Sequence, residues 1–235
     1  MRRGDIVWGG LLIGILALMA VPQTNKVFVR LTLGHPYLMS FAKFFMLATM
    51  GELLGQRIVS GRWSRPPGLG AKMLVWGMIG ILIMLTFEIF SQGVQAVLKK
   101  GLLPGGDNRL VAAFYTSLVA NITFGPVFMI FHRFSDTFIE VRCASGKKPS
   151  LKEIIDMIDW YNVYSFVVLT TIPVFWIPAH TLTFYLPGEY RMICAALLSI
   201  VIGAILSFAS KKGQAGIQLS PAKGVSSPRR LRPQY

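Results

Sequence analysis

The chain has 235 residues, enough for one compact domain. Hydrophobic residues make up 53% of it and charged residues only 14%, a balance that excludes an ordinary soluble protein. The net charge of +14 would suit a nucleic-acid partner only if the basic residues shared a soluble face. They fall instead between apolar runs of membrane-spanning length. We therefore expect an integral membrane protein that binds no nucleic acid.

Six segments approach the roughly 20 apolar residues that a helix needs to cross a bilayer. In chain order they are Ile6–Val21, Tyr37–Val59, Met73–Leu98, Leu110–Phe131, Val163–Leu186 and Arg191–Ser210. The pattern predicts an all-α fold, a polytopic transmembrane helix bundle of about six spans. We expect an extra N-terminal span and connector over residues 1–34, a helix bundle over residues 35–210, and a basic extended tail over residues 211–235.

The first segment has a second interpretation. Arg2 and Arg3, the apolar run and the stretch from Ala17 to Ala20 would also fit a signal peptide with a cleavage site. We expect the segment to be retained as a helix.

Ionisable residues inside spans are costly and usually face a bundle interior or a wet cavity. The second span carries Lys43 and Glu52, and the third carries Glu88. With a rise of about 1.5 Å per residue, Lys43 and Glu88 fall at similar depth if the middles of these antiparallel spans coincide. We expect them to form a pair or share a polar cavity, and Glu52 to lie level with residues 121–125. The alternative is that these charges join helices without lining a path.

Two pairs of glycines, Gly10 with Gly14 and Gly51 with Gly55, form faces on which neighbouring helices can approach closely. Prolines mark the later spans. Pro126 interrupts the fourth span, and the fifth is bent or ended by Pro173, Pro178 and Pro187. Each proline frees a backbone carbonyl that a neighbouring helix, a hydroxyl or water must satisfy.

Two polar residues of the fourth and fifth spans complete the candidates. Asn121 begins a glycosylation sequon, but its place inside a span argues against a glycan. His180 is interpreted as a hydrogen-bonded core histidine, with a proton relay as the alternative. The candidate pore or intramembrane polar residues are Lys43, Glu52, Gln56, Glu88, Asn121 and His180.

One loop helix is indicated between the fourth and fifth spans. Ser150, followed three residues later by Glu153, is a capping box that begins a helix. Apolar residues then recur at helical spacing up to Ile158, opposite charged ones, which predicts an amphipathic interfacial helix. Three of its acids could be imagined as a metal site, but a solvated helix face is the expected role: Glu153, Asp156 and Asp159.

The basic residues give the orientation, because cytoplasmic and matrix loops carry an excess of Lys and Arg. Six spans place seventeen of the 24 basic residues on the side of the two termini and six on the other side, with Lys43 inside a span. We therefore expect both termini on the positive side of the membrane, where anionic lipids are candidate partners.

The sequence contains no nucleophile–base pair, phosphate-binding loop or metal-ligand spacing. We therefore expect no catalytic residue, no cofactor, no metal and no enzymatic activity. Cys143 follows one span and Cys194 lies inside another, so a disulfide between them is not expected.

Several motifs together resemble the Mpv/PMP family of mitochondrial inner-membrane and peroxisomal membrane proteins. That family opens with a His-Pro or Tyr-Pro pair and a Gly-Asp-x-x-x-Gln motif, here His35-Pro36 and Gly51-Glu52-x-x-x-Gln56. Its later elements are matched by Trp176-Ile177-Pro178, Leu186-Pro187-x-x-x-Arg191 and Leu206-Ser207. The resemblance covers about residues 35–209. Glu52 replaces the family aspartate, Thr183 replaces an asparagine, and Ile177 separates Trp from Pro.

This resemblance implies a helix bundle in the inner mitochondrial membrane, or alternatively the peroxisomal membrane. Family members are regarded as channels of poorly defined selectivity. We consider two functional hypotheses. The first is a channel or solute-passage protein, and the second is an accessory subunit of a large respiratory-chain type complex, joined to protein partners by its extra helix and basic tail.

Overall fold

The computed structural model describes the backbone of residues 3–219 and the side chains of residues 3–208 other than Val167. Within this range every regular element is a helix, which confirms the all-α prediction. Six helical segments are long and apolar enough to cross a membrane. The chain is therefore an integral membrane protein built as a polytopic helix bundle.

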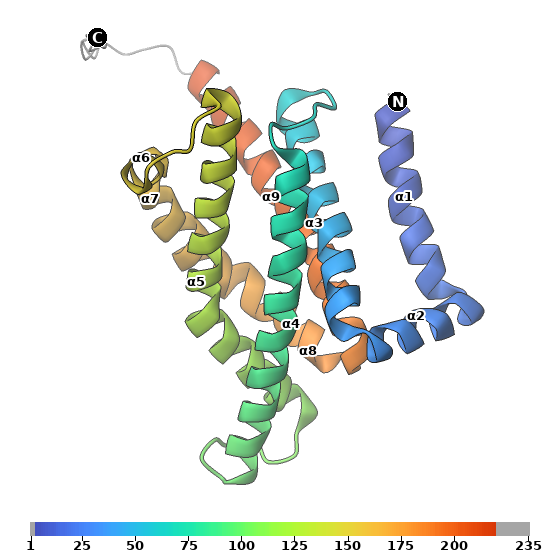
Figure 1. The fold of residues 1–235 in the computed structure, drawn as a ribbon. Helices are drawn as coiled ribbons and strands as arrows, with labels where there is room; N and C mark the ends of the chain where they lie inside the picture. The colour runs from blue at the N-terminus through green and yellow to red at the C-terminus, as the bar shows by residue number, and fades with distance from the viewer. Residues whose placement is uncertain (1–2, 220–235) are drawn as a thin grey trace.

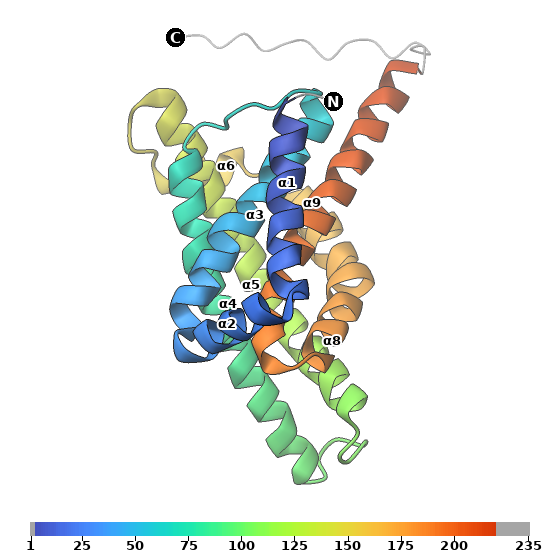
Figure 2. The ribbon, with the colours of Figure 1, turned by 90° about the vertical axis from the view of Figure 1, so that its right-hand side faces the viewer.

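The described chain begins and ends at the same end of the bundle (Figure 1). Helix α1 (Arg3–Ala20) starts there and α9 (Gly188–Leu219) finishes there, so we call it the termini end. At the opposite end, α4 (Leu69–Lys99) and α5 (Arg109–Ser145) project together beyond the other helices (Figures 1 and 2). We call this the hairpin end.

The connector after the first span is itself a helix, α2 (Pro22–Gly34). It runs across the bundle toward the start of α3 (Pro36–Ser60) and is joined to α1 at Val21 (Figure 1). Thr24 and Asn25 donate side-chain hydrogen bonds to the carbonyls of Leu18 and Met19, both at 2.6 Å. These bonds satisfy carbonyls that the end of α1 leaves without a helical partner.

Helices α3 and α4 form an antiparallel pair. Gly80 of α4 lies against Ser40 and Phe44 of α3, so closely that a Cβ there would be 2.6 Å from the Ser40 carbonyl oxygen. Gly61 ends α3 and Gly68 precedes α4, both with φ of 70°. Glycine suits this left-handed backbone because it has no Cβ to clash.

Helix α5 continues through Pro126 as a single helix, so the proline does not divide the fourth span into two helices. It also extends fourteen residues beyond Phe131, where the apolar run ends. The extension is stabilised by α6 (Leu151–Met157), whose buried Ile154 packs with Ile158 against Phe134 and Phe138. The predicted loop helix is confirmed, including both hydrogen bonds of its capping box.

The fifth span changes its winding along its length. A short helix α7 (Trp160–Asn162) leads into η1 (Val163–Trp176), which is wound as a π-helix, and then into α8 (Ile177–Tyr185). Pro173 lies inside η1 and Pro178 at the first turn of α8. Pro187 lies in the turn before α9. Three of the four predicted proline sites thus coincide with a change of helix type or direction.

Helix α9 packs against α3 through glycine. A Cβ at Gly51 would lie 2.9 Å from the Ser199 carbonyl oxygen, and one at Gly203 would lie 3.2 Å from the Gly51 carbonyl oxygen. The Gly51/Gly55 face therefore allows the close approach that the sequence predicted. Among the described residues nothing lies within 4 Å of a Cβ at Gly10 or Gly14, so no described part of the chain uses the other predicted face.

The predicted extended tail is wrong over residues 211–219, because α9 continues helically to Leu219. Lys, Gln and Ala favour a helix in this stretch, and no proline stops it. The remainder of that prediction, residues 220–235, lies outside the described residues.

Candidate functional site

A cavity of about 740 Å³ lies inside the bundle between α3, α4, α5, the η1–α8 segment and α9. Its walls are mainly apolar and aromatic, including Phe44, Phe87, Phe124 and Phe128. Exposed Ser60, Ser64, Arg133 and Asn162 lie along its rim and place its mouth at the termini end. Its volume is within the range of about 300–1,000 Å³ usual for small-molecule sites.

Below the mouth lies a cluster of charges built around Lys72. This side chain is only 3% exposed, and its Nζ lies 2.9 Å from Glu52 Oε1, 3.2 Å from Asp136 Oδ1 and 2.9 Å from Glu140 Oε1. The lysine comes from α4, Glu52 from α3 and the other two acids from α5. Glu52 and Asp136 line the cavity, so the cluster presents carboxylates to it.

Aromatic rings follow the charged cluster toward the interior. Trp76 lies one turn after Lys72 on α4, and its ring is 4.2 Å from that of His132 in an edge-on arrangement. Phe128 lies beside both rings, at 6.5 Å from Trp76 and 6.2 Å from His132. All three side chains line the cavity. The face of an aromatic ring attracts cations as well as apolar groups.

The floor of the cavity is formed by Asn121 and His180. The Asn121 amide nitrogen lies 3.1 Å from His180 Nδ1 and donates to the Ser117 carbonyl at 2.8 Å. The rings of Phe87 and Trp176 both lie 5.1 Å from the imidazole. His180 is therefore the hydrogen-bonded core histidine that the sequence suggested. Asn121 is buried, so its sequon is not accessible to a glycosylating enzyme.

Three buried side-chain atoms have no hydrogen-bond partner within the described part of the chain: Glu52 Oε2, His132 Nδ1 and Trp176 Nε1. All three belong to residues that line the cavity. A buried polar group without a partner costs about 1–3 kcal/mol, so such groups usually bind water or a ligand. Their concentration in one cavity marks it as the candidate site.

The structure brings four of the six candidate polar residues into this cavity. Glu52 and Gln56 lie toward the mouth, and Asn121 and His180 form the floor. Lys43 and Glu88 do not line it. Lys43 Nζ donates to Thr32 Oγ1 at 3.0 Å and lies 4.6 Å from the centre of the Phe28 ring, both on α2.

The predicted pairing of Lys43 with Glu88 is wrong. Glu88 is exposed and accepts a hydrogen bond from Gln92 at 2.8 Å. The contact of Gly80 with Ser40 and Phe44 places Lys43 level with that part of α4, and Glu88 lies about 12 Å further along the helix. The depth estimate failed because α4 projects past the start of α3, so the middles of the two spans do not coincide.

The predicted level of Glu52 is wrong for a related reason. Through Lys72, Glu52 meets Asp136 and Glu140 instead of residues 121–125. The fourth span was expected to end at Phe131, whereas α5 continues to Ser145. Lys72, Asp136 and Glu140 were therefore read as loop residues and missed. The signal that could have revealed them is that they lie at helical intervals from the residues of the neighbouring apolar runs.

The three acids near α6 have separate structural partners. Glu153 accepts from the Ser150 amide at 2.6 Å, Asp156 from Lys152 Nζ at 2.6 Å, and Asp159 from the Asn162 amide at 3.0 Å. The amide of Ser150 also holds the pKa of Glu153 below its usual value. These contacts agree with the solvated-face interpretation of the acids.

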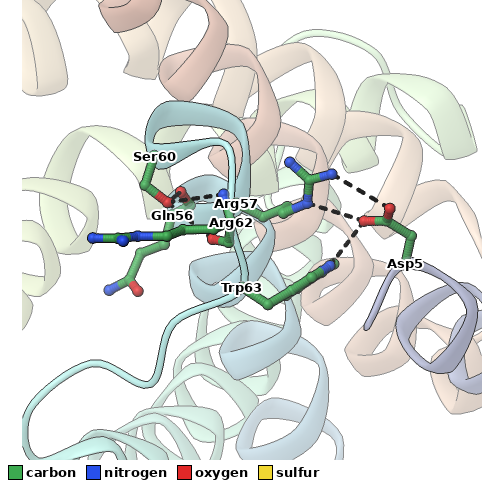
Figure 3. A network of polar contacts seen from close by, with 6 residues as sticks. All are labelled: Asp5, Gln56, Arg57, Ser60, Arg62 and Trp63. Carbon is green, nitrogen blue, oxygen red and sulfur yellow. Dashed lines mark hydrogen bonds and ion pairs between the residues drawn. The ribbon is translucent and has the colours of Figure 1, made fainter. Parts of the chain in front are cut away.

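Helix α1 is attached to the bundle at its first turns (Figure 3). Arg57 of α3 donates to both carboxylate oxygens of Asp5, at 3.0 and 3.3 Å, and the Trp63 indole donates to Asp5 Oδ1 at 2.8 Å. The indole of Trp8 donates to the Met50 carbonyl at 3.0 Å. No side chain of α1 is buried, so these polar contacts fix a helix that packs on the bundle along one side only.

The proline motif near the end of the fifth span forms the turn into α9. Arg191 Nε donates to the carbonyl of Leu186 at 3.2 Å, across Pro187, and its Nη1 donates to Ser91 Oγ of α4 at 3.3 Å. The guanidinium thus joins the end of α8, the start of α9 and the neighbouring helix α4.

Comparisons with models of protein families, with curated proteins and with solved structures returned no match to this chain. The resemblance to the Mpv/PMP family consequently rests on the sequence motifs, and what it implies is treated below as a proposal.

Proposed function

We propose that this membrane protein is a channel or solute-passage protein of an organelle membrane, and that the central cavity is its passage. The observation that supports this most is the convergence of polar side chains and unpartnered polar atoms on one cavity with a mouth at the bundle surface. Passage proteins bind solutes through such convergent groups between helices.

In this proposal the passage is closed at the floor. Asn121 and His180 line the deepest part of the cavity, and Ser117 and Thr183 beyond them are completely buried. A solute that enters at the termini end must displace this floor to leave at the hairpin end. The π-wound η1 segment and the turn at Pro178 are adjacent, and π-helical turns occur often at functional sites. Movement of η1–α8 against α5 is the proposed opening step.

The resemblance to the Mpv/PMP family supports the inner mitochondrial membrane as the location, with the peroxisomal membrane as the alternative. The positive residues support an arrangement with both termini in the matrix, or in the cytosol for a peroxisomal protein. Anionic lipid headgroups are the proposed partners of this basic end.

The test is solute efflux from liposomes containing the purified protein. We would measure efflux of potassium, chloride, choline and sucrose for the wild type and for Gly125→Leu. Gly125 lies midway along the cavity, and even a Cβ there would lie 3.1 Å from Ile172 Cδ1. The larger side chain should block the passage.

Gly93→Leu is the matched control, because nothing lies within 4 Å of a Cβ at that exposed position of the same bundle. We expect efflux of at least one solute by the wild type and by Gly93→Leu, and none by Gly125→Leu. Equal efflux by all three proteins, or none by any, would contradict the proposal.

A second candidate function is an accessory subunit of a membrane complex, and the free face of α1 favours it. In the part of the chain that the structure describes, nothing lies within 4 Å of a Cβ at Gly9, Gly10 or Gly14. Small residues on a membrane helix allow another helix to approach closely. Gentle solubilisation and native electrophoresis would test this role. Co-migration with a large complex, lost in Gly10→Ile/Gly14→Ile, is the expected result, and migration as a free protein would contradict it.

A further inference from the structure

The shape of the cavity indicates what it can bind. Asp136 lies near the mouth and Asn121 at the floor, both on α5 and both lining the cavity. The two are fifteen positions apart, which is a rise of roughly 22 Å along the helix. A volume of about 740 Å³ spread over such a length leaves a narrow space. This shape suits an elongated molecule.

The walls of this narrow space are apolar along most of its length. Phe124, Gly125 and Phe128 of α5, Ile172 of η1 and Ile83 of α4 all line it. Burying a hydrocarbon chain between them would contribute about 25 cal/mol for each Å² of apolar surface removed from water. The body of the ligand should therefore be apolar.

The charged cluster indicates the head group. Three carboxylates share the single ammonium of Lys72, with two contacts at 2.9 Å and one at 3.2 Å. Glu52 uses Oε1 for this contact, whereas its Oε2 is buried and without a partner among the described residues. A buried carboxylate oxygen is stabilised by a further positive charge or hydrogen-bond donor.

The rings next to the cluster fit the same kind of head group. Trp76, Phe128 and His132 line the cavity directly beneath Glu52 and Lys72. Aromatic rings recognise alkylammonium groups through the negative potential of their faces. An anionic head group would instead meet Glu52 and Asp136 and be repelled.

We propose that the cavity binds an amphipathic organic cation, with its ammonium group beside Glu52 Oε2 and the Trp76 ring and its apolar chain along Phe128, Phe124 and Ile83. This inference names the substrate class of the passage and rests on the proposed function of the cavity. The Trp176 indole at the floor has no hydrogen-bond partner among the described residues, so it can bind water or a polar group at the far end of the ligand.

The test is equilibrium binding of radiolabelled dodecyltrimethylammonium, below its micelle concentration, to the full-length protein in phosphatidylcholine nanodiscs. Empty nanodiscs give the partitioning background. Dodecanoate and tetramethylammonium serve as competitors, because the first has the chain with the opposite charge and the second has the head group without the chain. We expect saturable binding that neither competitor displaces at tenfold excess.

Two variants locate the site. Glu52→Gln keeps the shape but removes the charge, so binding should weaken at least about tenfold, the usual effect of losing one charge-assisted contact. Gly125→Leu fills the middle of the cavity and should abolish binding. The matched controls are Glu88→Gln and Gly93→Leu, both on exposed parts of α4, and these should bind as the wild type does.

Displacement by dodecanoate, or unchanged binding to Glu52→Gln and Gly125→Leu, would overturn the assignment. The efflux assay separates this failure from failure of the proposed function. If Gly125→Leu blocks efflux while dodecyltrimethylammonium shows no selective binding, the passage stands and the ligand class is wrong. If the cation binds selectively but neither it nor any solute of the efflux assay leaves the liposomes, the ligand class stands and the passage is wrong.

Discussion

Lys72 lies in the first turn of α4, where its side chain is enclosed by acids from two other helices. Lysine is rarely buried unless it is paired, because removing an ammonium from water is costly. Here one cation lies against three carboxylates at the junction of α3, α4 and α5. The cluster therefore stabilises this junction and also supplies the negative charge of the cavity.

Replacing Lys72 by leucine should destabilise the bundle strongly, because three carboxylates would remain close together without a cation. Removing one partner of a buried ion pair costs about 3–5 kcal/mol. Glu140 is more than half exposed, so water reduces the cost here to roughly 2–3 kcal/mol. The melting temperature in detergent, followed by tryptophan fluorescence, should fall by several degrees.

The control for this prediction is Lys100→Leu, which removes an exposed lysine at the hairpin end and should leave the melting temperature almost unchanged. The double variant Lys72→Leu/Glu52→Gln should recover part of the loss, because one of the unpaired charges is also removed. A Lys72→Leu protein as stable as the wild type would show that the cluster has no structural role.

At the scale of elements, the sequence predicted the existence of helices much better than their ends. Apolar runs mark the six spans, because lipid requires both apolar side chains and internally satisfied backbones. The polar stretch after Phe131 gave no such signal, although α5 continues through it to Ser145. That extension depends on packing by Ile154 and Ile158 of a later segment, which local composition cannot reveal.

The same limit explains which site residues were found. Glu52, Gln56, Asn121 and His180 lie within apolar runs, so their polarity made them visible candidates. Lys72 and Asp136 lie beyond the ends of those runs and resembled ordinary loop charges. Lys43 was visible too, but its partners on α2 were not, because that stretch was expected only to connect the first two spans.

The contact between α3 and α9 depends on Gly51. Replacement by valine would force its side chain against the backbone of Ser199 and Ile200, which cannot move without separating the helices. Overpacking of this kind costs typically about 1–3 kcal/mol. The melting temperature of Gly51→Val should therefore fall. Gly10→Val, at a position with nothing within 4 Å, is the control and should melt as the wild type does.

Helix α6 should lose stability in acid. The pKa of Glu153 lies below its ordinary value because its carboxylate accepts from the Ser150 amide. A lowered pKa in the folded state means that the stabilisation is complete above the unfolded value, about 4.3 for glutamate, and is lost as the pH falls through the lower folded value. Hydrogen exchange of residues 151–157, corrected for intrinsic rates, should report this loss.

Glu153→Gln provides the comparison, because its amide oxygen can still accept from Ser150 but does not titrate in this range. Protection of α6 in this variant should stay constant with pH. If wild-type protection is also constant down to the pH at which the whole bundle unfolds, the capping box does not determine the stability of α6.

At the scale of the whole molecule, the position of the two ends of the bundle and the distribution of positive charge together indicate the orientation in the membrane. The six spans bring the beginning of α1 and the last described turn of α9 to one end of the bundle (Figure 1), and that end also carries the mouth of the cavity. Arg62, Arg65, Arg142, Lys147 and Lys148 occur in or beside the loops at this end. Positively charged loops remain on the side from which a membrane protein is inserted. The mouth should therefore face the matrix or cytosol, and the hairpin end should face the opposite compartment.

Single cysteines at the two ends test this orientation in a Cys143→Ser/Cys194→Ala background. Lys148→Cys lies in the exposed loop before α6, and Asp107→Cys lies in the exposed loop between α4 and α5. In mitoplasts, a membrane-impermeant maleimide should label Asp107→Cys at once and Lys148→Cys only after the membrane is inverted or permeabilised.

The reverse pattern would mean that the charge rule fails for this chain, and labelling of both from one side would mean that the two loops are not separated by a membrane. Either result would also change the compartment from which a cation reaches Glu52, so the orientation decides the direction in which the cavity is loaded.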